Sequence, residues 1–402
     1  MEVEVAQWLV SDEAAPYRES VRGLSDPTSL KAGADLRRDL APDRAAAVLE
    51  LETLRRKGRA KLSDLADSLY LTREGLEQAT RWEVAQWRAR RLTANMAEVG
   101  IVLDVGCGLG IDSLGFQEGG WDVISIEKDP VTAVFAQANL CAGLEGKSGD
   151  AKGGRVIQAA LEDVDISGWL ADSQVALFLD PARRTSTYRS WDVADLSPSW
   201  DTVLDLVRVA AGPVVVKLGP GFPHTLIPEE ADVTWLSHHG DLVETTLWFP
   251  GTGRRAAVLL GDQPPMYITA TDAAAPSGPL GEYIYEPDPA ITRAHATGDL
   301  CRLLGAHRVA DSIAYLTSNT LMTTPFAQAF HVEEVMDHSE KTLRTWVRSH
   351  NIGALEIKTR GLNVDPATLR RTLKPTGSNT ATLILTPTAE GTKALVVTRV
   401  PA

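Results

Sequence analysis

Short apolar runs alternate with helical stretches through the middle of the chain, between residues 95 and 250. Five of the runs predict buried parallel strands, because each is mostly apolar and is bounded by turn-forming residues. They lie at 101–105, 122–127, 155–159, 175–180 and 213–218. A pair at 232–237 and 244–249 follows, and a run at 255–260 is expected to extend the sheet. This alternation predicts an α/β fold with a doubly wound sheet.

Different patterns flank this sheet domain, which we place at 93–262. Residues 1–92 are predicted to be helical, and their last helix is expected to run from Thr72 to Leu92 because its apolar positions recur at helical spacing. We interpret this region as a helical platform packed on the sheet domain. The alternative is that residues 78–80 form a flap over a ligand.

The C-terminal part of the chain mixes helical and strand patterns. Residues 263–330 contain stretches rich in Pro and Gly and are interpreted as a linker and connecting α/β region, with a helix expected at 289–304. Residues 331–402 predict an α+β domain. One of its helices begins at Asp365-Pro366, a pair typical of an N-cap followed by the first helical position.

A glycine-rich turn follows the first predicted strand. Asp104 precedes Gly106, Gly108 and Gly110, and glycine permits positive φ and close approach of the backbone to a ligand. A helix is expected from about residue 111, so its first N–H groups would face whatever lies on the turn. The spacing differs from the G-x-G-x-x-G fingerprint of dinucleotide sites.

Two charged residues at the ends of the second and fifth strands complete the expected site. Glu127 ends the second strand, where a carboxylate is placed to accept the ribose hydroxyls of a nucleoside. Lys217 lies at the end of the fifth strand, where a buried unpaired charge would be costly, so we expect it to face the ligand crevice.

The fourth strand ends in Asp180-Pro181-Ala182-Arg183. Ligands of open α/β sheets lie outside the carboxyl ends of the strands, so Asp180 is expected at the same crevice as the glycine turn. Arg183 could recognise a phosphate or another negatively charged group. It could equally pair with an acid of its own loop, as could the neighbouring Arg184, and the sequence leaves both alternatives open.

The Asp-x-Gly-x-Gly-x-Gly turn with its acid at the second strand resembles the first motifs of class I S-adenosylmethionine (SAM) methyltransferases. This resemblance implies a Rossmann-like seven-stranded sheet with SAM as the cofactor. It implies that Glu127 holds the ribose and that Asp163, or alternatively Glu162, lies near the adenine. The other residues implied to hold SAM are Asp104, Gly106, Gly108 and Gly110.

The motif at Asp180 resembles the fourth motif of nucleic-acid methyltransferases, commonly Asp-Pro-Pro followed by an aromatic residue or arginine. It implies that Asp180 and Pro181 accept hydrogen bonds from an exocyclic amine and so position it for methylation. Ala182 replaces the second proline and Arg183 the aromatic residue, so base stacking is not implied there. No cysteine follows strand four or five, which favours nitrogen or oxygen methylation over carbon methylation.

Charge is distributed unevenly along the 402 residues. The net charge of −13 argues against a uniformly basic nucleic-acid binder. Residues 101–290 carry a net charge of −16, whereas residues 291–402 carry a net charge of +4. The segment 341–375 contains eight basic residues and only two acidic ones. This basic segment predicts contact with RNA phosphates, with a solvated helix face as the alternative. The expected RNA-binding residues are Arg344, Arg348, Arg370 and Arg371.

Four stretches together resemble a bacterial family of class I SAM methyltransferases with a C-terminal THUMP-like domain. They are the Asp180 motif, Lys217-Leu-Gly-Pro-Gly221, Tyr283-Ile-Tyr-Glu-Pro-Asp288 and Leu355-Glu-Ile-Lys-Thr-Arg-Gly361. The resemblance implies an RNA substrate, tRNA or rRNA, methylated at a base nitrogen. The alternatives are a protein or small-molecule methyltransferase, and a non-catalytic RNA-binding or assembly factor that retains a SAM pocket.

Other functional classes find no support in the sequence. The spacing of Cys107, Cys141 and Cys301 suits neither a disulfide framework nor a zinc site. Adjacent side chains on a strand point to opposite faces, so His238-His239 is not expected to bind a metal. No apolar run is long enough to span a bilayer, and Met1-Glu-Val-Glu-Val does not resemble a signal peptide. We expect a cytoplasmic protein without a metal or membrane contact.

Overall fold

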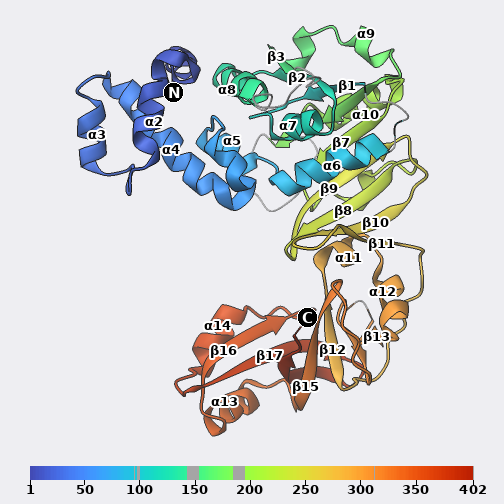
Figure 1. Ribbon diagram of the computed structural model, residues 1–402. Helices are drawn as coiled ribbons and strands as arrows, with labels where there is room; N and C mark the ends of the chain where they lie inside the picture. Colours follow the sequence, from blue (N-terminus) through green and yellow to red (C-terminus); the bar gives the residue numbers. More distant parts are fainter. Residues whose placement is uncertain (95, 97–99, 143–153, 184–194, 312, 402) are drawn as a thin grey trace. The chain divides into compact units, whose positions relative to one another are not determined.

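The computed structural model describes residues 1–94, 96, 100–142, 154–183, 195–311 and 313–401 (Figure 1). The chain divides into two compact units. The first comprises Met1–Asp232 with Thr246–Thr252, and the second comprises Val233–Thr245 with Gly253–Ala402. None of the helices in these described stretches combines the length and apolar character needed to cross a bilayer.

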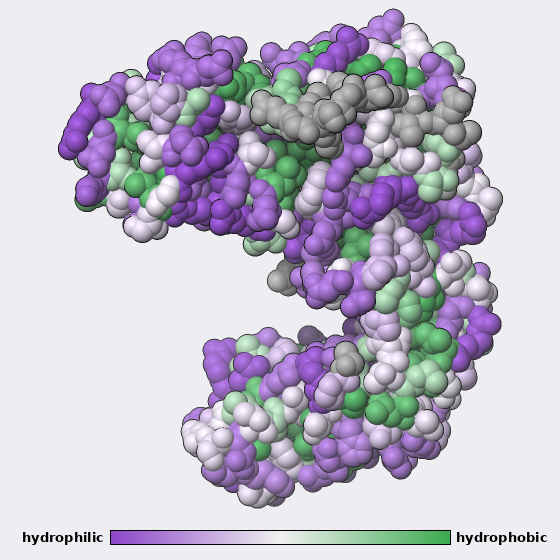
Figure 2. Space-filling model, viewed as in Figure 1, coloured by the Kyte–Doolittle hydropathy of each residue, from purple (hydrophilic) through white to green (hydrophobic). Residues whose placement is uncertain are grey.

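Helices make up the first 94 residues, as predicted. They are α1 (Val3–Val10), α2 (Ala15–Arg22), α3 (Leu30–Leu36), α4 (Pro42–Leu62), α5 (Arg73–Gln78) and α6 (Trp82–Ala94), with the short helices η1 (Asp12–Ala14) and η2 (Ser63–Asp67). Their buried apolar residues share one core with Leu109, Ile111 and Phe135 of the sheet domain. The helical region therefore packs on the sheet domain, and the view in Figure 2 shows that its surface is mainly hydrophilic.

The predicted helix from Thr72 to Leu92 is wrong in one respect, because it is interrupted between α5 and α6. The Thr72 hydroxyl caps α5 by accepting from the N–H of Gly75 at 3.0 Å. Ala79 is not helical, and the Thr80 hydroxyl donates to Asp112 Oδ2 at 2.5 Å. This tertiary hydrogen bond holds the connection outside the helical path that its apolar spacing predicted.

A buried asparagine joins the helical region to the glycine turn. Asn139 has no exposed surface, and its Oδ1 accepts from the N–H of Tyr70 at 2.7 Å. Its Nδ2 donates to the carbonyls of Tyr70 at 3.1 Å and of Leu109 at 2.9 Å. One side chain thus fixes the segment before α5 against the glycine turn.

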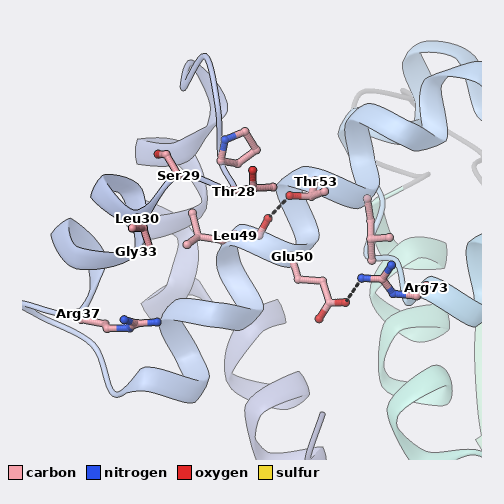
Figure 3. Close-up of a pocket in the computed structure, with 11 residues that line it drawn as sticks. Thr28, Ser29, Leu30, Gly33, Arg37, Leu49, Glu50, Thr53 and Arg73 are labelled. Atoms are coloured by element: carbon pink, nitrogen blue, oxygen red, sulfur yellow. Dashed lines mark hydrogen bonds and ion pairs between the residues drawn. The ribbon is translucent and has the colours of Figure 1, made fainter.

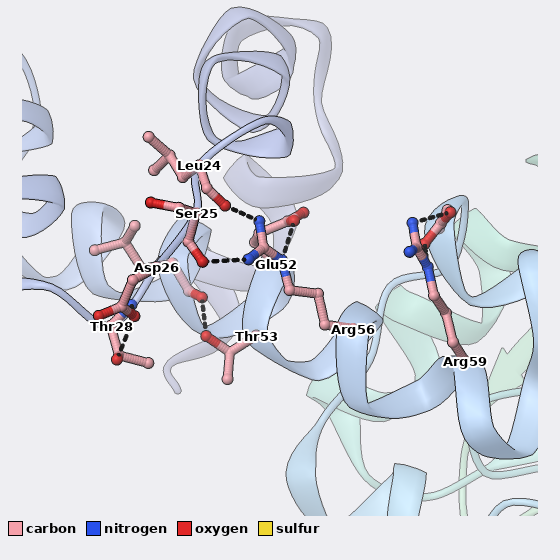
Figure 4. Close-up of polar contacts among 10 residues, drawn as sticks. Leu24, Ser25, Asp26, Thr28, Glu52, Thr53, Arg56 and Arg59 are labelled. Atoms are coloured by element: carbon pink, nitrogen blue, oxygen red, sulfur yellow. Dashed lines mark hydrogen bonds and ion pairs between the residues drawn. The ribbon is translucent and has the colours of Figure 1, made fainter.

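The connection between α2 and α3 is fastened to α4 through Arg56. Arg56 Nε donates to Glu52 Oε1 at 2.9 Å, and its Nη1 donates to the carbonyl of Ser25 at 3.2 Å (Figure 4). Its Nη2 contacts the carbonyl of Leu24. Its two Nη contacts to backbone carbonyls thus hold the connection, and the bond to Glu52 orients the guanidinium.

A cavity of about 310 Å³ lies beside α3 and α4. Figure 3 shows Glu50 and Arg73 facing each other at its edge, with an ion-pair distance of 3.5 Å. Leu30 lines it and is 95% exposed. The arginines that line it, Arg37 and Arg73, have exposed side chains, so the cavity offers no buried charge to a ligand.

The doubly wound sheet predicted from the apolar runs is present and has nine strands. They are β1 (Ile101–Val105), β2 (Asp122–Glu127), β3 (Gly154–Gln158), β4 (Val175–Leu179), β7 (Val214–Leu218), β8 (Asp232–His238), β9 (Asp241–Phe249), β10 (Arg255–Leu260) and β11 (Met266–Thr269). Their order is β11-β10-β8-β9-β7-β4-β1-β2-β3. Seven of these strands form the predicted doubly wound set, and β10 extends it, as expected, together with β11.

Parallel pairing brings the carboxyl ends of the central strands to one edge. β1 pairs in parallel with β2 and β4, β2 with β3, and β4 with β7. β4 is buried along its whole length. β8 and β9 are joined by His239 and Gly240, which both have positive φ, as a two-residue hairpin turn requires.

Helices cover the sheet. They are α7 (Ile111–Glu118), α8 (Pro130–Ala142), α9 (Ser167–Leu170) and α10 (Trp200–Val209), with η3 (Leu161–Asp163) and η5 (His224–Leu226). α6 packs closely on α7 (Figure 1). A Cβ on Gly115 would lie 2.9 Å from the carbonyl oxygen of Ala85, so this approach requires glycine. A separate two-stranded ribbon consists of β5 (Ala182–Arg183) and β6 (Leu196–Ser197).

A seven-stranded mixed sheet dominates the second unit. Its strands are β12 (Tyr283–Pro287), β13 (His307–Arg308), β14 (Leu316–Ser318), β15 (Ala327–Asp337), β16 (Ile352–Thr359), β17 (Asn379–Thr388) and β18 (Gly391–Arg399). Their order is β13-β14-β12-β15-β18-β17-β16, and only β16 and β17 pair in parallel among the described pairs. Strands from 283 to 318 thus share this sheet with those of the predicted C-terminal domain. The domain boundaries themselves stay a prediction.

Four helices accompany this sheet: α11 (Pro289–Arg293), α12 (Thr297–Leu304), α13 (Glu340–Ser349) and α14 (Pro366–Leu373). The single helix predicted at 289–304 is wrong, because His295 adopts φ 59° between α11 and α12. The N-cap of α14 is confirmed, since Asp365 accepts from the N–H of Thr368 at 2.8 Å.

Candidate functional site

The glycine turn leaves open space beside its backbone. Gly106, Gly108 and Gly110 have φ of 78°, 55° and 77°. A Cβ on Gly108 would meet nothing within 4 Å, and one on Gly106 would lie 3.5 Å from the carbonyl oxygen of Asp180. Gly110 instead faces α8, where its Cβ would touch Ala136 at 3.8 Å. Side chains at the first two glycines would occupy the space that a ligand needs, so the turn fits a bound nucleoside cofactor.

Glu127 connects the end of β2 to this turn. Its Oε2 accepts from the N–H of Gly108 at 3.0 Å, and its Oε1 accepts from the N–H of Asp129 at 2.9 Å. The residue is 9% exposed. A carboxylate can accept about four hydrogen bonds, so each oxygen retains capacity for a ligand hydroxyl.

Asp104 lies beneath the turn and has no exposed surface. Its Oδ2 accepts from the hydroxyl of Ser113, which lies 2.9 Å from that of Ser125, so three elements meet there. Its Oδ1 has no hydrogen bond to any residue that the structure describes. Burial raises the pKa of Asp104 to about 7, and the Asp180 carboxylate contributes to this rise. The bond to Ser113 therefore joins the end of β1 to the first turns of α7.

Replacing Asp104 with asparagine should remove a pH-dependent destabilisation. Between the ordinary pKa of 3.8 and about 7, the folded chain retains a proton on Asp104 that the unfolded chain has released. Through this group, the free energy of unfolding should fall by up to about 1.4 kcal/mol per pH unit as the pH rises across that window. Asparagine does not titrate, so the free energy of unfolding of the variant should rise relative to that of the parent as the pH approaches neutral. Urea unfolding at several pH values measures this difference. A difference that stays constant with pH would contradict this expectation.

Asp180 and Lys217 form an ion pair at the carboxyl edge of the sheet, as their positions after β4 and in β7 allowed. Lys217 Nζ lies 2.5 Å from Asp180 Oδ2 and 3.6 Å from Asp112 Oδ2. The Asp180 side chain is 33% exposed and that of Lys217 is 14% exposed. Asp180 Oδ1 has no hydrogen-bond partner among the described residues. Within the described part of the chain, the pair thus presents one oriented carboxylate oxygen without a hydrogen-bond partner.

Arg88 and Asp112, which the sequence did not single out, support this pair together with Thr80 of the alternative flap at 78–80. Arg88 is fully buried and contacts Asp112 Oδ1, while Thr80 holds Asp112 Oδ2. Asp112 in turn lies near Lys217. In the sequence, Asp112 has the position of an ordinary acid in the first turn of a helix, and nothing distinguishes Arg88 from the other arginines of α6.

For the remaining predicted residues of this site, the structure describes no side-chain hydrogen bond to the glycine turn or to the Asp180–Lys217 pair. Pro181 is buried, and the backbone of Arg183 pairs with Leu196 in the β5–β6 ribbon. Arg184 lies outside the described residues. Asp163 is exposed at the end of η3, after β3. Its predicted proximity to a base stays a prediction.

Cys107 offers no activated nucleophile. Burial, with the nearby charges of Asp104 and Glu127, raises the pKa of its thiol well above the ordinary range. A thiol is a weak nucleophile unless it ionises. This agrees with a site that methylates without a covalent cysteine intermediate.

The predicted RNA-binding arginines lie on α13 and α14, which pack against each other in the second unit (Figure 1). Arg344 is half-buried, lies 2.5 Å from Glu340 Oε1 and also donates to the carbonyl of Thr372 at 3.4 Å. Arg371 donates to the Thr368 hydroxyl at 3.0 Å. Arg348 and Arg370 are exposed and form no ion pair with a described residue.

Similarities to known proteins cover both parts of the chain. Residues 327–399 match the family described as THUMP domain-like. Over 367 residues, the chain is 30% identical to proteins of two Mycobacterium tuberculosis strains, covering 87% of this chain and 94% of theirs. Those relatives are named uncharacterized S-adenosylmethionine-dependent methyltransferases.

A solved structure shares the fold over nearly the whole chain. It is the crystal structure of a protein from Porphyromonas gingivalis W83 assigned as a methyltransferase. The TM-score is 0.77 with 22% sequence identity, and the match covers 97% of this chain and 98% of the other. The likeness therefore includes the helical N-terminal region and the C-terminal sheet as well as the nine-stranded sheet.

Proposed function

Because this chain belongs to the S-adenosylmethionine-dependent methyltransferases, we propose that it methylates a base nitrogen in a structured RNA, either tRNA or rRNA. The observation that carries the proposal is Oδ1 of Asp180, which no described residue occupies and which the bond from Lys217 to Oδ2 holds beside the glycine turn. A carboxylate in this state is suited to orient an N–H donor.

The residues proposed to hold SAM surround the glycine turn. Gly106 and Gly108 give it room, and Glu127 offers its remaining acceptor capacity to the ribose hydroxyls. Asp104 acts indirectly through Ser113, and Asp163 is proposed near the adenine. When bound, SAM supplies a methyl group on a positively charged sulfur, which leaves as a neutral thioether.

Asp180 is proposed to position the acceptor nitrogen and to receive its proton. Oδ1 accepts a hydrogen bond from the exocyclic amine, while the bond from Lys217 prevents the carboxylate from rotating away. The carbonyl of Pro181 is proposed as a second acceptor. The nitrogen lone pair forms the new N–C bond, the C–S bond breaks, and the nitrogen loses one proton, for which Asp180 Oδ1 is the nearest proposed acceptor. Positioning of this kind supplies much of the rate enhancement in such reactions.

The proposed RNA contact lies in the second unit, for two reasons. Residues 101–290 carry a net charge of −16 and would repel a polyanion, whereas 341–375 carries +6. The THUMP domain-like match at 327–399 includes α13 and α14. Exposed Lys341 and Lys374 add to the arginines of these helices.

Changing Arg344, Arg348, Arg370 and Arg371 together to glutamine should weaken RNA binding and flatten its salt dependence. Each lost phosphate contact should reduce the magnitude of the log–log salt slope by roughly 0.7–0.9. Arg344 should contribute least, because Glu340 already neutralises it. RNA binding across a salt series measures both effects, and SAM affinity should not change.

A matched control removes four positive charges elsewhere. Lys31, Arg38, Lys57 and Arg90 are exposed residues of the helical region, and their change to glutamine should leave the slope near that of the parent. Equal slopes for parent and test variant would make the arginines of α13 and α14 a solvated face only.

The function itself is tested by comparing modified nucleosides in RNA from cells with and without this protein. Loss of one N-methylated nucleoside, restored by the purified protein and SAM, is the expected result. The acidic charge of residues 101–290 also permits a protein or small-molecule acceptor. Methyl transfer that persists in extract stripped of RNA would favour that alternative, and SAM binding without transfer would favour a non-catalytic factor.

A further inference from the structure

Two basic side chains of the helical region lack a carboxylate partner. Lys61, near the end of α4, donates to the backbone carbonyls of Leu76 at 3.0 Å and Glu77 at 2.7 Å. The Arg81 side chain, in the α5–α6 connection, makes no hydrogen bond or ion pair within the described part of the chain. Both residues are half-buried. A half-buried cation without an anion is costly, so the pair is suited to a negatively charged ligand.

Both cations lie on the segment that packs against the glycine turn. Thr80, next to Arg81, is bonded to Asp112 in the first turn of α7. Gly75 of α5 packs so closely that a Cβ there would lie 2.7 Å from Leu109 Cδ1. Lys61 holds the C-terminal end of that same α5. The helical region therefore brings these charges to the donor side of the site.

Among the described residues, the other two cations of the site already have carboxylate partners. Arg88 is paired with Asp112, and Lys217 with Asp180. Burial lowers the pKa of Lys61 to about 8, and the nearby positive charges of Lys217 and Arg81 lower it further. An anion bound by Lys61 and Arg81 would offset this repulsion and favour the charged form of Lys61.

We propose that Lys61 and Arg81 bind the α-carboxylate of the methyl donor. The inference rests on the placement of SAM over the glycine turn in the proposed function, and not on the identity of the acceptor. The carboxylate is the one negative group of SAM, whose sulfonium and ammonium are both positive. A phosphate of the acceptor is the less favoured occupant, because α5 approaches Leu109 of the glycine turn and Thr80 is bonded to Asp112 in the first turn of α7.

Calorimetric titration with SAM and with decarboxylated SAM tests the proposal in the full-length chain without RNA. For Lys61→Gln/Arg81→Gln, affinity for SAM should fall about ten- to a hundred-fold, which is typical for losing charge-assisted hydrogen bonds. Affinity for decarboxylated SAM should stay within about two-fold of the parent. The control Lys57→Gln/Arg90→Gln removes the same charge from exposed positions on α4 and α6 and should bind both ligands as the parent does.

Two further variants separate binding from folding. Lys61→Gln also loses hydrogen bonds to α5, so its melting temperature is compared with that of the parent. Arg81→Gln alone breaks no described side-chain hydrogen bond or ion pair and should still weaken SAM selectively. Lys61→Arg/Arg81→Lys retains both charges and should recover most of the affinity.

The outcomes distinguish this inference from the proposed function. Equal weakening of both ligands, or of neither, would overturn the carboxylate assignment. So would unchanged SAM affinity combined with a raised KM for RNA, which would place the two cations at the acceptor. If the parent binds SAM with this carboxylate dependence but methylates no RNA, only the RNA proposal fails.

Discussion

Asp180→Ala should lower kcat for methyl transfer about a hundred-fold or more, while SAM affinity stays within a few-fold of the parent. The change removes the oxygen that is proposed to orient the acceptor nitrogen and receive its proton. It leaves the glycine turn and Glu127 intact. Lys217 keeps a carboxylate neighbour, because Asp112 Oδ2 lies 3.6 Å from its Nζ. Transfer of labelled methyl groups to RNA gives kcat, and calorimetry gives the affinity.

Two companion variants sharpen the experiment on Asp180. Asp180→Asn keeps the shape and one acceptor oxygen but cannot take up a proton, so it should retain more activity than alanine if positioning dominates. Asp201→Ala removes an exposed acid of α10 and should leave kcat unchanged. If Asp180→Ala instead abolishes SAM binding, Asp180 belongs to the cofactor contacts rather than to the acceptor site.

Glu127→Ala should weaken SAM binding about ten- to a hundred-fold, because a charge-assisted contact contributes about 1.5–3 kcal/mol. The structure adds a second reason for this loss. Glu127 also accepts from the N–H of Gly108, so its removal leaves the turn less well held. Titration calorimetry measures the change.

Glu229→Ala is the matched control for this change, since Glu229 is exposed on the loop before β8. It should bind SAM as the parent does. A folded Glu127→Ala variant with the parent's SAM affinity would exclude Glu127 from the cofactor site.

The fold was largely predictable where the pattern of apolar residues is local. β1, β2 and β4 begin and end within a residue of the predicted strands, because buried parallel strands are continuous in apolar residues. Prediction from the apolar pattern failed at two helices, each of which was expected to be continuous but is interrupted in the structure. Thr80 and His295 interrupt apolar patterns that fit a helix, and at Thr80 the cause is a bond to Asp112, 32 residues away.

Site residues could be predicted only where a residue type is characteristic of the carboxyl end of a strand. Gly106, Glu127, Asp180 and Lys217 follow such positions, although their roles still await the tests above. The pairing of Asp180 with Lys217 required the register of β4 and β7, which the sequence does not contain. Lys61 and Arg88 come from helices whose other arginines and lysines look the same in sequence. Only packing distinguishes them.

Asn139 couples the folding of the helical region to that of the glycine turn. Its amide satisfies both backbone groups of Tyr70 and the carbonyl of Leu109 within one buried site. A fragment beginning at the predicted boundary near residue 93 would lose the bonds to Tyr70 and would expose the apolar residues of the sheet domain that share a core with the helical region. The first helices and the glycine turn should therefore unfold as one cooperative block rather than as separate modules. In evolutionary terms, this sheet domain could not be exchanged between proteins without carrying its N-terminal helices along.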